Sequence, residues 1–122
     1  MTQEEKEILF KDLCARLPYG VIVNINGISN VRLDNVSWYE EVGVDDSSTI
    51  LYHISEVKPY LFPLSSMTDA QKQEYQHITE RWMYDSSYSI GDSIDWLNAH
   101  HFDYRGLIEK GLAIDATELN IY

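Results

Sequence analysis

Leucines recur at four-residue spacing near the start of the chain, which is the pattern of one apolar face on a helix. This face is formed by Leu9, Leu13 and Leu17. Thr2 and Glu5 stand before it, three residues apart, and are typical of a capping box, in which each side chain accepts a hydrogen bond from the other residue's backbone N–H. Pro18 predicts the end of the helix, because proline lacks the N–H that a helix interior needs.

Apolar and polar side chains then alternate from about Tyr19 to Ser55, and this period of two is typical of β-strands. Turn-forming pairs separate the alternating runs, namely Asn26-Gly27, Asp34-Asn35 and Asp45-Asp46. The sequence therefore predicts four antiparallel strands in a meander. Their alternating apolar residues are Val21, Val23 and Ile25, then Val31 and Leu33, then Val36, Trp38 and Val42, and finally Ile50, Tyr52 and Ile54.

Two prolines occur within six residues in the segment 58–63, and each removes a backbone donor that a central strand would use. We predict that this segment is a connector whose aromatic side chains enter the core. Helical spacing resumes after it. The pattern predicts an amphipathic helix over residues 69–84 with Thr68 as its N-cap, a helix over 91–101, and a short helix from Asp103 to Lys110 that ends at Gly111.

The order of these elements predicts an α+β fold, because the strands are consecutive rather than alternating with helices. We expect one domain over residues 1–122, with an N-terminal helix, a four-stranded antiparallel meander and three C-terminal helices packed on one face of the sheet. The chain is long enough to bury one core. The residues predicted to be buried are Leu9, Leu13, Leu17, Val23, Trp38, Tyr52, Ile78, Trp82, Ile94, Leu97, Leu107 and Ile108.

The chain is strongly acidic, with 20 Asp and Glu against nine Lys and Arg and a formal net charge of −11. Contacts to phosphates need clustered basic side chains, so we expect no direct binding to nucleic acid or to an anionic membrane surface. Residues 90–114 have the outline of a helix-turn-helix with a wing, but acids outnumber their two basic residues, Arg105 and Lys110. The charge permits a protein partner with a basic surface, a divalent cation, or a surface that is acidic only for solubility.

Cys14 is the single cysteine, so no intrachain disulfide can form, as is usual in cytosolic proteins. Its apolar neighbours on the first helix predict a small buried thiol rather than a nucleophile. The first residues carry acids where a signal peptide is basic, and no apolar run is long enough to span a bilayer. We therefore expect a cytoplasmic protein.

Four acidic residues make a local negative cluster, with Glu40 and Glu41 in the third predicted strand and Asp45 and Asp46 in the turn that follows. Such a cluster is usually a solvated surface, and the sequence alone favours that interpretation. The alternative is an interaction surface that resembles a phosphate array and binds the basic groove of another protein. Calcium is disfavoured, because the cluster lacks the alternating ligand spacing of a calcium-binding loop.

His100, His101 and Asp103 form the second candidate, a weak metal site. Adjacent helical residues point about 100° apart, whereas metal ligands must converge. A histidine at the edge of the core explains His101, and an N-cap explains Asp103 better than a ligand does. The sequence contains no GxSxG, HExxH or phosphate-binding glycine motif, so it predicts neither an enzyme nor a cofactor.

Three segments resemble parts of small uncharacterised proteins from phages, prophages and mobile elements of Bacteroides-type gut bacteria. These segments are Lys11–Val21, Lys58–Thr68 and Asp95–Ala113, and together they cover about a third of the chain. The resemblance implies a phage or mobile-element origin and residence in the cytoplasm. It carries no activity, and therefore no functional residues, to this chain.

Two functions fit the sequence. The first is a small non-enzymatic accessory protein that binds another protein through an acidic, aromatic surface. The second is a small enzyme, or a ligand or metal binder, with a site between the sheet and the helices that uses His53, His77, His100 or His101. Convergence of these histidines in a cleft would favour the second.

Overall fold

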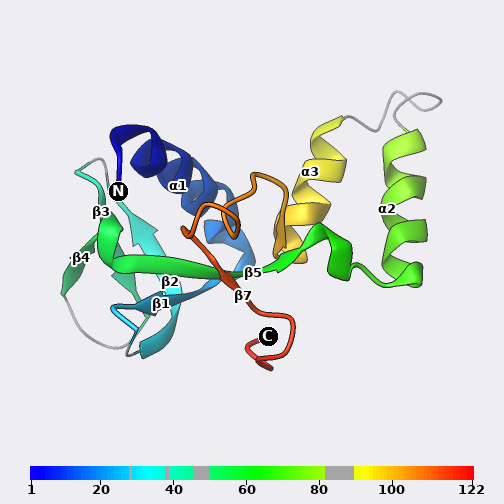
Figure 1. Ribbon diagram of the computed structural model, residues 1–122. Helices are drawn as coiled ribbons and strands as arrows, with labels where there is room; N and C mark the ends of the chain where they lie inside the picture. Colours follow the sequence, from blue (N-terminus) through cyan, green and yellow to red (C-terminus); the bar gives the residue numbers. More distant parts are fainter. Residues whose placement is uncertain (28, 38, 46–49, 82–89) are drawn as a thin grey trace.

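The computed structural model describes residues 1–27, 29–37, 39–45, 50–81 and 90–122 (Figure 1). They form a mixed α+β fold with a seven-stranded sheet. The helices are α1 (Gln3–Arg16), α2 (Asp69–Arg81) and α3 (Ile90–Ala99). The strands are β1 (Ile22–Ile25), β2 (Ser29–Val36), β3 (Glu41–Val44), β4 (Leu51–His53), β5 (Val57–Pro63), β6 (Phe102–Asp103) and β7 (Ile114–Asp115). No helix in the described ranges is both long and apolar enough to cross a membrane.

Helix α1 begins and ends as its sequence predicts. The Glu5 backbone N–H donates to Thr2 Oγ1 at 3.1 Å, and the Thr2 N–H donates to Glu5 Oε1 at 2.8 Å, which completes the capping box. The hydrogen bonds that its carboxylate accepts from Thr2, first of all from the Thr2 N–H, lower the pKa of Glu5. After Arg16 the chain makes a 3-10 turn that contains Pro18, and Gly20 follows in the left-handed region with φ of 69°. Helix α1 lies over one face of the sheet (Figure 1).

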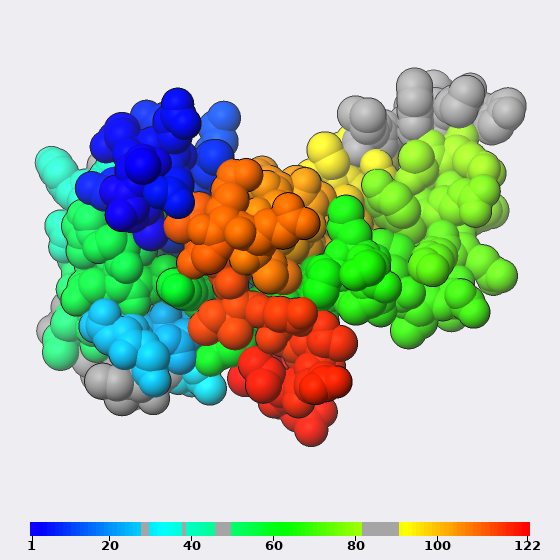
Figure 2. All heavy atoms as spheres, in the orientation of Figure 1, coloured from blue at the N-terminus to red at the C-terminus, as the bar shows by residue number. Residues whose placement is uncertain are grey.

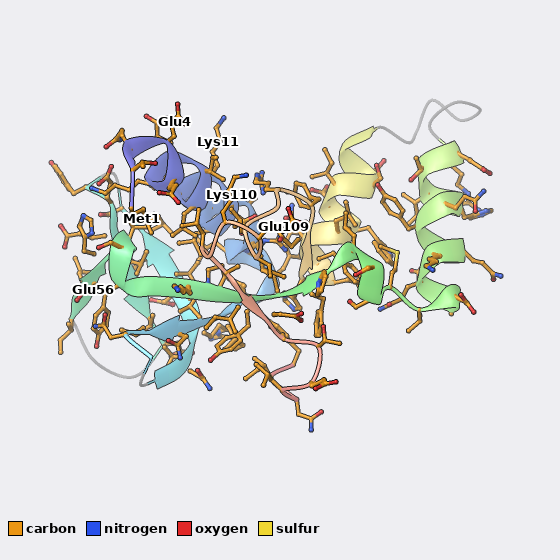
Figure 3. All side chains as sticks on the ribbon, viewed as in Figure 1. Met1, Glu4, Lys11, Glu56, Glu109 and Lys110 are labelled. Carbon is orange, nitrogen blue, oxygen red and sulfur yellow. The ribbon has the colours of Figure 1, made fainter. Side chains whose placement is uncertain are left out.

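The outer face of α1 carries exposed charged side chains, among them Glu4, Glu7 and Lys11. Figure 3 shows Glu4 and Lys11 directed away from the sheet, while Leu9 and Leu13 are buried beneath the helix. Cys14 is exposed, so the prediction of a buried thiol is wrong. It follows Leu13 by one residue, and the rotation of about 100° per residue turns it off the buried face. Partial burial still raises the pKa of its thiol, which is therefore protonated at neutral pH.

The first four strands pair in sequence order and antiparallel, but they are only part of the sheet. The strand order is β4-β3-β2-β1-β5-β6, with β7 also paired to β5. The expected four-stranded arrangement is therefore wrong. Strand β5 adds to β1, and the short strands β6 and β7 pair with β5 in parallel. Figure 2 shows the last residues of the chain, in red, lying beside this part of the molecule.

Strand β5 contains both prolines of the segment that we expected to be a connector, and the ladder explains why they are tolerated. The Asn26 N–H donates to the Glu56 C=O at 2.9 Å. In an antiparallel pair, residues that exchange hydrogen bonds alternate with residues that do not. Pro59 lies opposite Val23 in a pair that exchanges none, so β1 does not need an N–H from Pro59. Pro63 is the last residue of the strand. The missing N–H groups therefore cost no bond between β1 and β5.

The predicted turn at Asp34-Asn35 is a β-bulge inside β2. Leu33 pairs with Val44 and Asn35 pairs with Gly43, so Asp34 is an extra residue on β2. The strand continues to Val36, and the next strand, β3, begins only at Glu41. Asp and Asn are common both in turns and at irregular strand positions, so their presence alone did not distinguish the two.

Helices α2 and α3 pack against each other rather than side by side on one face of the sheet (Figure 1). Thr68 and Gln71 form the predicted cap of α2, with the Gln71 N–H donating to Thr68 Oγ1 at 3.2 Å. The residues after Asp103 form turns instead of a third helix, so the prediction of three C-terminal helices is wrong. An aromatic cluster around Trp96 and Phe102 holds α2 and α3 together, apart from the core beneath α1.

The predicted core is confirmed for half of its described residues. Leu9, Leu13, Val23, Leu97 and Leu107 are buried. Partial burial is found for Leu17, Tyr52, Ile78 and Ile108. Trp38 and Trp82 lie outside the described residues.

Ile94 was predicted to be buried, but 41% of it is exposed. Trp96 and Leu97 face inward, and with Ser93 they set a buried face on α3 that is rotated away from Ile94.

Candidate functional site

Glu40 occupies the connection between β2 and β3, in a left-handed conformation with φ of 59°. Its carboxylate lies 3.8 Å from Lys6 Nζ and 3.7 Å from His53 Nε2. The Gln3 amide donates to the same carboxylate at 3.5 Å. Glu40 therefore links the start of α1 to strand β4, and Lys6 partly compensates its negative charge.

The other three acids of the predicted cluster differ in their surroundings. Glu41 begins β3 and lies opposite His53 of β4. Asp45 follows β3 and forms an ion pair with Arg32 on the neighbouring strand. Asp46 lies outside the described residues. Glu40 and Glu41 thus lie next to β4, whereas Asp45 is at the other end of β3 with its own cation.

Strand β4 lies at the edge of the sheet, and large apolar side chains are exposed beside it. Tyr39, in the connection before β3, is 82% exposed, and Leu51 in β4 is 49% exposed. Strand β4 has β3 as its single neighbour in the sheet that the structure describes. Glu56 closes the far end of β4, where its Oε2 accepts the His53 N–H at 2.9 Å (Figure 3). An edge strand with exposed apolar side chains is a site where another chain can add.

The His100, His101 and Asp103 group does not converge as a metal site. The two Asp103 oxygens accept the backbone N–H groups of Leu107 at 3.0 Å and Ile108 at 2.9 Å. Asp103 therefore caps a turn and not the helix that was predicted to follow it. His100 lies over the Trp96 ring, with centroids 4.2 Å apart. Within the described part of the chain, no three His, Cys, Asp or Glu residues could hold a metal ion together.

His101 has the most unusual environment of the histidines in the described ranges. Its backbone is left-handed with φ of 63°, and its ring stacks on Tyr122 at 3.7 Å and 11°. Burial lowers its pKa to about 4, with smaller contributions from the Arg16 and His100 charges. The ring is therefore neutral at pH 7. His53 lies on β4 and His77 is exposed on α2, so the four histidines do not share one cleft.

The lowered pKa of His101 predicts a loss of stability in mild acid. An unfolded histidine has a pKa of about 6.5, so protons favour the unfolded state as the pH falls from about 6.5 to about 4. This contribution to the free energy of unfolding is fully present above pH 6.5. The free energy of unfolding, measured in urea, should fall less between pH 7 and pH 5 for His101→Asn than for the wild type. For His77→Asn it should fall as much as for the wild type. An NMR titration of His101 near pH 6.5 would contradict this prediction.

A cavity of about 380 Å³ adjoins His101. It is lined by Phe62, Ser66, Thr68, Gln71, Ala99, His100, His101, Phe102, Thr117 and Tyr122. The Tyr122 hydroxyl accepts the Ile22 N–H at 2.9 Å and donates to the Tyr60 C=O at 2.8 Å, and burial raises its pKa. The sequence indicated His100 and His101 as candidate site residues, but it did not indicate that Gln71, Thr117 and Tyr122 line this cavity. No periodic pattern connects these three residues.

A buried ionic network binds the backbone of Phe102, one of the residues that line the cavity. Asp12 and Arg16 are both fully buried and pair at 2.8 Å, and Arg105 reaches the other Asp12 oxygen at 2.8 Å. Arg16 Nη2 also donates to the Phe102 C=O at 2.6 Å. Arg16 Nη1 is buried without a hydrogen-bond partner among the described residues. This network fixes α1 against the segment that carries the histidines.

The sequence did not reveal this network, because an Asp and an Arg four residues apart on a helix also form ion pairs on exposed helix surfaces.

Comparison of the chain with protein-family models, with curated proteins and with solved structures gave no match.

Proposed function

We propose that this protein is a small non-enzymatic accessory protein of a phage or mobile element that binds another protein in the cytoplasm. Its docking site is the β4 surface, which we define as Tyr39, Glu40, Glu41, Leu51 and Glu56. The observation that carries the proposal is the exposed apolar edge: Tyr39 is 82% exposed and Leu51 is 49% exposed beside an edge strand. Monomeric proteins normally protect such edges.

The backbone of β4 supports strand addition. The Ile54 N–H donates to the Glu40 C=O at 2.8 Å. In an antiparallel pair every second residue bonds to the neighbouring strand, so Tyr52 bonds to β3. The N–H and C=O groups of Leu51 and His53 therefore point away from β3. Glu56 already accepts the His53 N–H. Leu51 therefore presents the main-chain groups with which an added strand would pair.

The negative charge of the β4 surface favours a partner with positive charge. Glu40, Glu41 and Glu56 surround the edge, and the whole chain carries a net charge of −11. Complementary charge raises the association rate and rejects acidic partners. The partner is thus a protein with a basic, extended segment.

The test is affinity capture with matched baits. Leu51→Lys places a positive charge on the edge strand and should abolish capture of a stoichiometric basic protein from host lysate. Leu119→Lys makes the same change at another exposed leucine, 48% exposed, and should capture as the wild type does. Affinity measured on the purified pair should fall at least about tenfold for Leu51→Lys, the effect of losing one central contact. No basic protein in the wild-type capture, or equal capture by both variants, would refute the proposal.

A further inference from the structure

The cavity beside His101 is built from parts of the chain that are far apart in sequence. One wall comes from β5, the 3-10 turn Leu64–Ser66 and the start of α2, a second from the end of α3, and a third from Thr117 and Tyr122. Its volume of about 380 Å³ lies in the range of small-molecule sites, about 300–1,000 Å³. It is separate from the β4 surface, because the two share no residue.

The lining of the cavity is uncharged. The lining residues in the described ranges include no Asp, Glu, Lys or Arg, although the chain contains 20 acids and nine basic residues. The neutral state of His101 at pH 7 agrees with this. The lining offers a charged ligand no counter-ion. The ligand is therefore uncharged.

Flat side chains form much of the lining. The His101 and Tyr122 rings are nearly parallel, and the Phe62 and Tyr122 centroids lie 5.9 Å apart. His100 and Phe102 supply two further rings. The His101 and Tyr122 rings cover one face of each other, so a planar ligand would pack on the remaining ring faces or edges, at an offset or edge to face.

The polar groups on the side of α2 can both donate and accept. Gln71 Oε1 accepts the Thr68 N–H at 2.9 Å, which leaves the Gln71 amide protons to donate. Thr68 Oγ1 accepts the Gln71 N–H at 3.2 Å, so its hydroxyl proton is also available. The Ser66 hydroxyl donates to the Pro63 C=O at 2.7 Å and therefore presents an acceptor oxygen.

Thr117 adds a second acceptor on the opposite wall, because its hydroxyl donates to the Asp115 carboxylate. The cavity thus combines two donors with two acceptors. A carboxylate or phosphate ligand can only accept hydrogen bonds and would make no bond to these acceptors. A ring with N–H groups and with C=O or imine groups on its edge can bond to both the donors and the acceptors of the cavity.

We propose that this cavity binds a small, uncharged, planar heteroaromatic molecule of the nucleobase class, stacked on its aromatic walls and hydrogen-bonded at its edge. This site is independent of the protein-binding β4 surface, so either proposal can fail without the other.

The test uses adenine and uracil as probes and benzoate as an anionic planar control, with saturation-transfer NMR on the whole protein at pH 7. Ala99→Phe fills the cavity from an exposed helical position, and Ala70→Phe makes the same change on α2 outside the lining. Thermal unfolding should show that both variants fold. We expect at least one base to bind the wild type and Ala70→Phe, with affinity reduced at least about tenfold in Ala99→Phe.

Contacts of the bound base should map to the rings of Tyr122 and Phe62 in NMR spectra. Absence of binding by both bases, equal binding by Ala99→Phe and Ala70→Phe, or tighter binding of benzoate than of either base would each overturn the proposal.

Discussion

An Asp12→Ala variant is expected to lose about 3–5 kcal/mol of its free energy of unfolding, because the substitution leaves buried positive charge without its counter-ion. The Asp12 carboxylate is fully buried and binds Arg16 Nε and Arg105 Nη1, each at 2.8 Å. Arg105 is 26% exposed at its side chain and can recover some hydration, whereas Arg16 is fully buried and cannot. The cost therefore falls mainly on Arg16.

Urea unfolding at pH 7 measures this loss, with Glu7→Ala as the control because Glu7 is an exposed acid on the same helix. The control should change stability by no more than about 0.5 kcal/mol. A double variant, Asp12→Leu with Arg16→Met, removes both charges and should recover most of the loss, since an apolar pair of similar size can replace a buried ion pair. A loss below about 1 kcal/mol for Asp12→Ala would show that the network contributes little.

The same network explains how distant parts of the chain come together at the His101 cavity. Arg16 binds the Phe102 C=O, 86 residues away in the sequence, and Arg105 binds Asp12 across 93 residues. The guanidinium groups of both arginines also lie near the Tyr104 ring, at 5.4 Å and 4.6 Å from its centroid. Destabilised Asp12 variants should therefore disturb the cavity before they disturb the β4 surface.

Local signals in the sequence predicted local structure well. The Thr2–Glu5 capping box and the turn at Pro18 each depend on residues within five positions of one another. Alternation also predicted that β1 to β4 pair antiparallel. These features depend on backbone geometry and neighbouring side chains, which a single sequence specifies directly.

Predictions that depended on distant partners were less successful. Pro59 argued against a strand, yet its place in β5 is harmless because of the register with Val23, which the sequence does not reveal. Ile94 had helical spacing to Leu97, but the aromatic cluster around Trp96 sets a different buried face. The walls of the cavity could not be predicted for the same reason, since Gln71 and Tyr122 meet only in the folded chain.

Leu13→Ala is the second substitution with a large expected effect, a loss of about 2–5 kcal/mol in the free energy of unfolding. Leu13 is fully buried in the core that α1 forms with the sheet. Alanine favours helices at least as well as leucine, so the loss reports the cavity and the missing contacts rather than a weaker helix.

Leu119→Ala makes the same chemical change at a leucine that is 48% exposed, and it should cost no more than about 0.5 kcal/mol. Both variants can be compared by urea unfolding at pH 7, where His101 is neutral in the wild type and in each variant. Because Leu13 contacts the sheet and not the Trp96 cluster, its truncation should leave the packing of α2 on α3 unchanged at temperatures where the variant stays folded. Equal losses for the two leucines would mean that α1 does not pack on the sheet as described.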